Sequence, residues 1–115
     1  MVTRDPGDDI FELPGGRIDE GESVNDCVMR ELREELNIDL SSVVLNYVHS
    51  EQVMHTRDNR MQMMIAFSMV LPEDICNKIQ FSDEVAEMDW VDSTTYISHN
   101  YYSDAKRTLD IFFNK

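Results

Sequence analysis

Three glutamates, at positions 31, 34 and 35, are the residues of this chain whose types and spacing could do chemistry. On a helix, side chains three and four positions apart are neighbours, so Glu31 would lie beside both Glu34 and Glu35. Like charges in this arrangement destabilise a helix by about 0.2–0.5 kcal/mol per pair, and a divalent cation among them removes that cost. Oxygen-only ligation suits Mg²⁺ or Mn²⁺ better than zinc. By itself this spacing is more often a solvated acidic helix face, so the choice of a cation site depends on the residues around it.

A helix over residues 24–36 must position these carboxylates. Its apolar stripe repeats at helical spacing and consists of Val24, Val28, Leu32 and Leu36. Ser23 is a suitable N-cap, and Asp26 three residues later completes a capping-box pattern. Asn37 can end the helix because asparagine tolerates the left-handed conformation. The pattern predicts one amphipathic helix with carboxylates at the edge of its buried face.

The spacing continues on both sides of the glutamates. It reads Gly16, five residues, Glu22, seven residues, Arg30-Glu31, two residues, Glu34-Glu35, one residue, Asn37-Ile38. This stretch, about a fifth of the chain, closely resembles the Nudix box. One position departs from the family pattern, because the family usually has glycine where Asn37 stands. The departure is conservative, since asparagine also adopts the left-handed conformation.

The resemblance implies a role for each matched residue. The metal ligands would be Glu31, Glu34, Glu35 and the backbone carbonyl of Gly16. Glu22 would support the metal cluster, and Arg30 would orient the catalytic glutamates through a salt bridge, with phosphate binding as its alternative role. Glycines in the preceding turn would let the backbone approach metal and substrate closely.

The general base stays open between two sources. Some family members use a box glutamate, which would be Glu31 here, and others use an acid on a later loop. In this chain Glu84 and Glu87 are the loop candidates, against the alternative of solvated surface charges. Arg57 and Arg60 lie near a hairpin that often lines the substrate pocket in the family, although turn charges for solubility are the simpler interpretation.

Size, charge and cysteine content limit the class of protein. The chain has 115 residues, a formal net charge of −13 and 42% hydrophobic residues, which indicates one globular domain over residues 1–115. A charge of this sign argues against binding to nucleic-acid polymers or anionic membranes. Two cysteines make no disulfide framework, and no signal peptide or membrane-spanning run is visible. We therefore expect a cytoplasmic protein with no membrane partner.

The remaining elements predict an α/β fold. Strands are expected near residues 1–4, 10–13, 43–53, 61–71 and 87–91, and a final helix follows Ser103, its expected N-cap. On the fourth strand the core-directed residues would be Met61, Met63, Ile65, Phe67 and Met69. We also expect Trp90 in the core.

This order of elements predicts an α/β/α sandwich with a mixed sheet, which the resemblance also implies. Nudix proteins usually have one or two further strands before the point where this chain begins. Either an N-terminal segment is lacking here or this version of the fold is trimmed.

The resemblance implies hydrolysis of a nucleoside diphosphate linked to another group. Markers of several substrate subgroups are missing, so a MutT-like nucleoside triphosphate pyrophosphohydrolase with a small nucleotide substrate is the favoured function. The alternative is a noncatalytic Nudix-fold module that senses nucleotides or binds partners. Such modules often lose box glutamates, and here Glu22, Glu31, Glu34 and Glu35 are all retained. The oligomeric state stays open, with a homodimer among the options.

Overall fold

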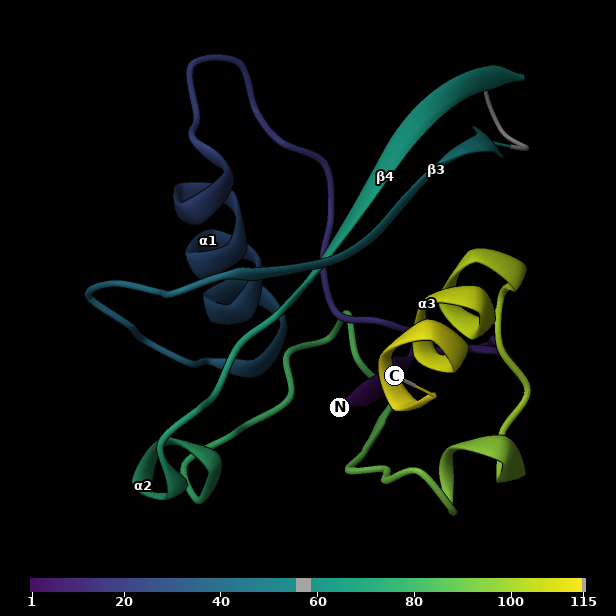
Figure 1. Ribbon diagram of the computed structural model, residues 1–115. Helices are drawn as coiled ribbons and strands as arrows, with labels where there is room; N and C mark the ends of the chain where they lie inside the picture. The colour runs from purple at the N-terminus through teal and green to yellow at the C-terminus, as the bar shows by residue number, and fades with distance from the viewer. Residues whose placement is uncertain (56–58, 115) are drawn as a thin grey trace.

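The strands of the protein lie between two helices in the computed structural model, which describes residues 1–55 and 59–114. The elements are β1 (Val2–Arg4), β2 (Phe11–Glu12), α1 (Val24–Leu36), β3 (Asn46–His55), β4 (Arg60–Ser68), α2 (Glu73–Cys76), β5 (Glu87–Asp89), a 3₁₀ turn (Tyr96–Ser98) and α3 (Ser103–Phe113). Helices α1 and α3 lie on opposite sides of the strands (Figure 1), as an α/β/α sandwich requires. The expected fold class is confirmed.

The strands pair in two separate sheets rather than in the single mixed sheet expected. Strand β1 pairs antiparallel with both β2 and β5, and β3 pairs antiparallel with β4. Among the described residues, parallel pairing is confined to an isolated bridge between Phe11 and Tyr101. In the described part of the chain, no strand joins the β3–β4 hairpin to the short strands around β1.

Helix α1 begins and ends as its local sequence predicts. Ser23 Oγ accepts a hydrogen bond from the Asp26 backbone N–H at 3.1 Å. Asn37 adopts the left-handed conformation with φ 54°, and its N–H donates to the Arg33 carbonyl. Leu36 is fully buried and packs with Leu32, Ile38 and Val85 in one of two hydrophobic clusters. This packing fixes which face of α1 turns outward.

The second hydrophobic cluster lies around β1, β2 and α3. Its buried members are Val2, Phe11, Tyr96 and Leu109. Helix α3 begins at Ser103, but Tyr102 is the capping position and no side chain caps the helix there. The expectation of Ser103 as N-cap is therefore wrong. Helix α3 is stabilised by the packing of Leu109 and Phe113 against this cluster rather than by a side-chain cap.

The β3–β4 hairpin turns the opposite face inward from the one predicted. Met61, Met63 and Ile65 are 54%, 60% and 48% exposed, whereas Ala66 is buried. The inward face is the one that carries Glu51 of β3, which forms an ion pair with Arg107 of α3 at 2.7 Å. Methionines occupy both faces of β4, so alternation alone could not identify the buried one.

Trp90 lies outside the core, contrary to expectation. Strand β5 ends at Asp89, which is the last residue paired with β1, and the indole of Trp90 is 51% exposed. Val91 packs against the core instead. No helix among the described residues is long and apolar enough to cross a membrane.

Candidate active site

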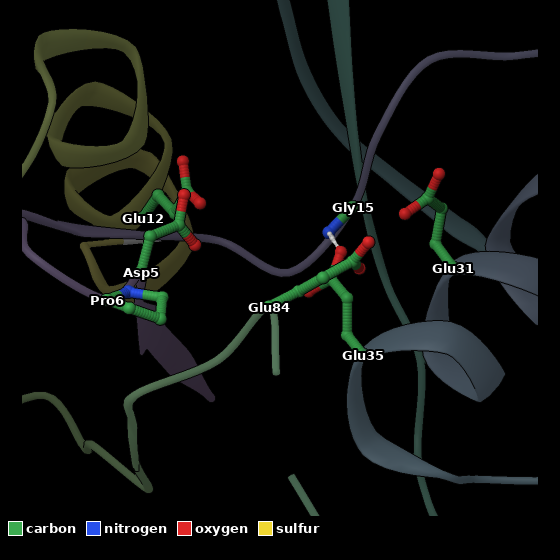
Figure 2. Close-up of a pocket in the computed structure, with 7 residues that line it drawn as sticks. All are labelled: Asp5, Pro6, Glu12, Gly15, Glu31, Glu35 and Glu84. Atoms are coloured by element: carbon green, nitrogen blue, oxygen red, sulfur yellow. Dashed lines mark hydrogen bonds between the residues drawn. The ribbon is translucent and has the colours of Figure 1, made fainter. Parts of the chain in front are cut away.

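A cavity of about 360 Å³ opens between α1 and the three-stranded sheet. Its lining residues are Asp5, Pro6, Glu12, Gly15, Glu31, Glu35 and Glu84. Figure 2 shows Asp5 and Glu12 on one side of the cavity, Glu31 on the opposite side, and the side chains of Glu35 and Glu84 close to Gly15 between them. Carboxylates dominate the lining, and no cationic side chain belongs to it among the described residues. A cavity of this charge favours cations and disfavours bare anions.

The glycine turn meets α1 at this cavity. The Gly15 N–H donates a hydrogen bond to Glu35 Oε1 at 3.3 Å. Gly15 has φ 154°, a conformation that other residues rarely adopt. A Cβ atom at Gly16 would collide with the Glu31 carboxylate. Gly16 therefore allows the close approach of this loop to Glu31, whereas Gly15 suits the backbone conformation of the turn.

The guanidinium of Arg30 donates hydrogen bonds to three carboxylates of the box. Its Nε and Nη2 atoms donate to both oxygens of Glu22, at 2.8 and 3.0 Å. Its Nη1 atom donates to Glu31 at 2.8 Å and to Glu34 at 3.2 Å. The hydrogen bonds from Arg30 lower the pKa of Glu22 to about 2. Because its guanidinium is engaged by these carboxylates, Arg30 is arranged to orient the glutamates rather than to reach into the cavity.

The structure brings Glu31 and Glu35 to the cavity but not Glu34. The carboxylate of Glu34 turns to Arg30, and it is absent from the residues that line the cavity. As the side chains stand, no three acidic, histidine or cysteine side chains of the described residues are grouped closely enough to hold a metal ion. Glu31 and Glu35 beside the Gly15–Gly16 backbone still offer an oxygen-only donor set, which fits a hard divalent cation.

Crowding of carboxylates raises proton affinities around the cavity. Burial raises the pKa of Glu35 to about 8, and the adjacent Glu31 carboxylate adds to the shift. Burial and the neighbouring Asp5 raise the pKa of Glu12 to about 7. Both shifts express the cost of placing several negative charges in one partly buried space. A bound divalent cation would offset this cost.

The two loop acids named from sequence occupy different places. Glu84 lines the cavity, whereas the Glu87 carboxylate binds Arg4 Nε at 3.1 Å and is absent from the lining. Arg60 is exposed at the start of β4 and does not line the cavity. Arg57 lies outside the described residues.

Sequence reasoning missed Asp5 and Glu12. They lie in the turn after β1 and on β2, and antiparallel pairing of these strands brings them to one side of the cavity. Their spacing matches no motif, so nothing in the sequence marked them as site residues. The only indication in the sequence that Glu12 lies near the glycine turn is its position two residues before Pro14.

Comparison with known proteins decides the family. The NUDIX domain profile matches residues 1–110. The chain belongs to the Nudix family. It is similar to RNA pyrophosphohydrolases of Campylobacter jejuni strains, with 41% identity over 47 residues, which is 41% of this chain. That alignment spans only 30% of the length of these relatives.

A solved structure shares the fold of this chain. The solution structure of the E. coli ORF135 protein superposes with a TM-score of 0.73 and 19% sequence identity. The match covers 98% of this chain and 78% of that chain. At this level of identity the similarity extends to the fold alone.

Proposed function

We propose that this Nudix domain is a pyrophosphohydrolase that cleaves a nucleoside triphosphate in the presence of Mg²⁺ or Mn²⁺, giving a nucleoside monophosphate and pyrophosphate. The observation that carries the proposal is the convergence of Glu31 and Glu35 on the Gly15–Gly16 turn inside an acidic cavity. Membership in the Nudix family supports the same reaction class.

The residues around the cavity would have different roles in the reaction. A bound divalent cation would neutralise the phosphoryl oxygens and bring the phosphate chain to the glutamates. Glu31 and Glu35 would hold it with the Gly16 carbonyl, and Glu34 would join if its side chain left Arg30. Glu31 is our candidate for the base that takes the proton of the attacking water, because Arg30 Nη1 holds its carboxylate in one orientation.

A loop acid is the alternative base. The position of Glu84 in the cavity lining supports it over Glu87, whose carboxylate is bound to Arg4. A base must come within hydrogen-bonding reach of the water that it activates. Of the two loop acids, only Glu84 lines the cavity in which the substrate would bind.

A second candidate substrate is the 5′-triphosphate end of RNA. The names of the Campylobacter relatives favour it. The net charge of −13 opposes it, because a polyanion is repelled along its whole length whereas a single nucleotide is not. Turnover of nucleoside triphosphates should therefore exceed turnover of RNA ends.

One experiment separates these possibilities. The chain is incubated with Mg²⁺ and, in parallel, with each nucleoside triphosphate and with a short RNA that carries a 5′-triphosphate. Products are identified by chromatography, and the Glu31→Gln variant serves as control. We expect pyrophosphate and a nucleoside monophosphate, with no product from the variant. Binding of nucleotides without any product would identify a noncatalytic sensing module instead.

We also place the protein in the cytoplasm. Cys27 and Cys76 are both free thiols, as is usual in a reducing compartment.

A further inference from the structure

The C-terminal end of α1 binds the loop that carries Glu84. The last carbonyls of a helix have no partner within the helix and must find one elsewhere. Here the Leu36 carbonyl accepts from the Gln80 N–H at 3.1 Å, and the Glu35 carbonyl accepts from the Ser82 N–H at 2.9 Å. The backbone of Glu35, whose side chain lines the cavity, therefore anchors the loop directly.

Asn37 adds a third bond to this junction. Its side-chain Nδ2 donates to the Gln80 carbonyl at 2.7 Å. The backbone of Asn37 has φ 54°, which glycine adopts at lower cost. The conformation alone thus does not require asparagine. What the asparagine contributes is the hydrogen bond between the helix end and the loop.

Beyond Gln80 the loop is short and internally bonded up to Glu84. Ser82 Oγ accepts from the Glu84 N–H at 3.2 Å, and the Ser82 carbonyl accepts from the Val85 N–H at 3.2 Å. Val85 is buried against the hydrophobic cluster of α1. Glu84 is therefore held between an anchor at residue 80 and an anchor at residue 85.

We infer that Asn37 is a positioning residue that acts through Glu84: its side chain fixes the loop at residues 80–84 so that the Glu84 carboxylate stays on the cavity wall beside Glu31 and Glu35. This inference rests on the proposed hydrolase function and adds to it a residue that touches neither substrate nor metal. It also assigns a role to Asn37, the one residue at which the box departs from the family pattern.

The test replaces Asn37 by glycine, which keeps the backbone conformation and removes the amide. We expect kcat to fall about five- to tenfold, the equivalent of one lost hydrogen bond. The melting temperature should not fall correspondingly, because glycine is favoured at this φ. Asn59 provides a matched control, since it has φ 52° in the turn before β4 and lies away from the cavity. Asn59→Gly should leave kcat unchanged.

A double-mutant cycle distinguishes positioning from a general structural effect. If Asn37 acts through Glu84, Asn37→Gly should have no further effect on kcat in a Glu84→Gln background. If the two effects multiply instead, Asn37 does not act through Glu84 and the inference is overturned.

Amide hydrogen exchange tests the junction without reference to catalysis. The N–H groups of Gln80 and Ser82 should exchange faster in Asn37→Gly than in the wild type or in Asn59→Gly. Unchanged exchange in an active enzyme would refute the positioning role alone. Absence of hydrolysis by the wild-type chain, with faster exchange in the variant, would refute the proposed function while leaving the junction as described.

Discussion

Arg30 separates the box glutamates into two electrostatic groups. Glu22, Glu31 and Glu34 each accept a hydrogen bond from its guanidinium, whereas no hydrogen bond joins Arg30 to Glu35 in the described structure. Glu35 instead accepts a hydrogen bond from the Gly15 N–H and adjoins Glu31. The hydrogen bonds from Arg30 lower the pKa of Glu22 to about 2, whereas burial, together with the adjacent Glu31, raises the pKa of Glu35 to about 8. Glu35 is thus the box carboxylate with the most to gain from a bound cation.

Replacement of Glu31 by glutamine should lower kcat by at least ~10²–10³-fold, because it removes both a proposed metal ligand and the candidate base. Glu87→Gln is the control for the loss of one negative charge. It should lower kcat much less, because Glu87 pairs with Arg4 away from the cavity. Steady-state kinetics at saturating Mg²⁺ would measure both. A Glu31→Gln enzyme close to wild type would exclude Glu31 as the base and leave Glu84 in that role.

Stability without metal should fall as pH rises. Glu12 and Glu35 have folded-state pKa values raised to about 7 and about 8, so between their ordinary values and these the folded state binds more protons than the unfolded state. The free energy of unfolding therefore decreases with pH over this window, and the stabilisation present below about pH 4.5 is lost by about pH 8. Thermal melts in excess chelator would measure the slope. Glu35→Gln should flatten it, and an unchanged slope in that variant would contradict the assignment.

At the level of elements, α1 brings Glu31 and Glu35 to the cavity, and both of its ends are capped locally. The Ser23 hydroxyl satisfies one of the free N–H groups at the start, and the left-handed Asn37 satisfies carbonyls at the end. Helix α3 lacks a side-chain cap at its start and depends more on packing. The box glutamates thus lie on a helix whose first and last residues are determined by its own sequence.

Ser23→Ala should lower the free energy of unfolding by about 0.5–2 kcal/mol, since it removes the hydrogen bond to the Asp26 N–H. Ser103→Ala is the matched control at α3, where the serine does not cap the helix, and it should change stability little. Urea denaturation followed by circular dichroism would measure both. Equal losses in the two variants would mean that the capping bond contributes nothing at Ser23.

For the molecule as a whole, negative charge is concentrated where the helices and sheet meet. The chain carries a net charge of −13, and its main cavity is lined by five carboxylates. A phosphate chain entering this cavity alone would meet repulsion, whereas a phosphate chain that binds together with divalent cations would not. The cation requirement that we propose would therefore be a property of the assembled cavity rather than of the box helix alone.

Mg²⁺ should raise the melting temperature of the whole protein, because a cation that binds only the folded state stabilises it by mass action. At a hundredfold excess over Kd the gain is about 2.7 kcal/mol. A sodium salt at equal ionic strength controls for screening of the net charge, and Glu35→Gln should reduce the gain. Identical melting temperatures in Mg²⁺, sodium and chelator would contradict a cation site in this cavity.

The sequence by itself determined α1 and the chemistry that it carries. The cap at Ser23, the left-handed residue at Asn37 and the apolar stripe all depend on neighbours within one or two turns, so their pattern is visible without knowledge of the fold. The spacing of the box glutamates is local for the same reason. From these residues alone, the family and the carboxylate chemistry of the helix could be predicted.

Only the tertiary structure decided what faces that helix. Asp5, Glu12 and Glu84 reach the cavity through strand pairing and through backbone bonds to the end of α1. No local sequence pattern marked Asp5 or Glu12, and the sequence offered Glu84 only as one of two loop candidates. Methionines lie on both faces of β4, and the inward face of the hairpin is the one on which Glu51 of β3 contacts Arg107 of α3. Contacts between segments distant in sequence depend on which surfaces pack together, and that choice belongs to the whole chain.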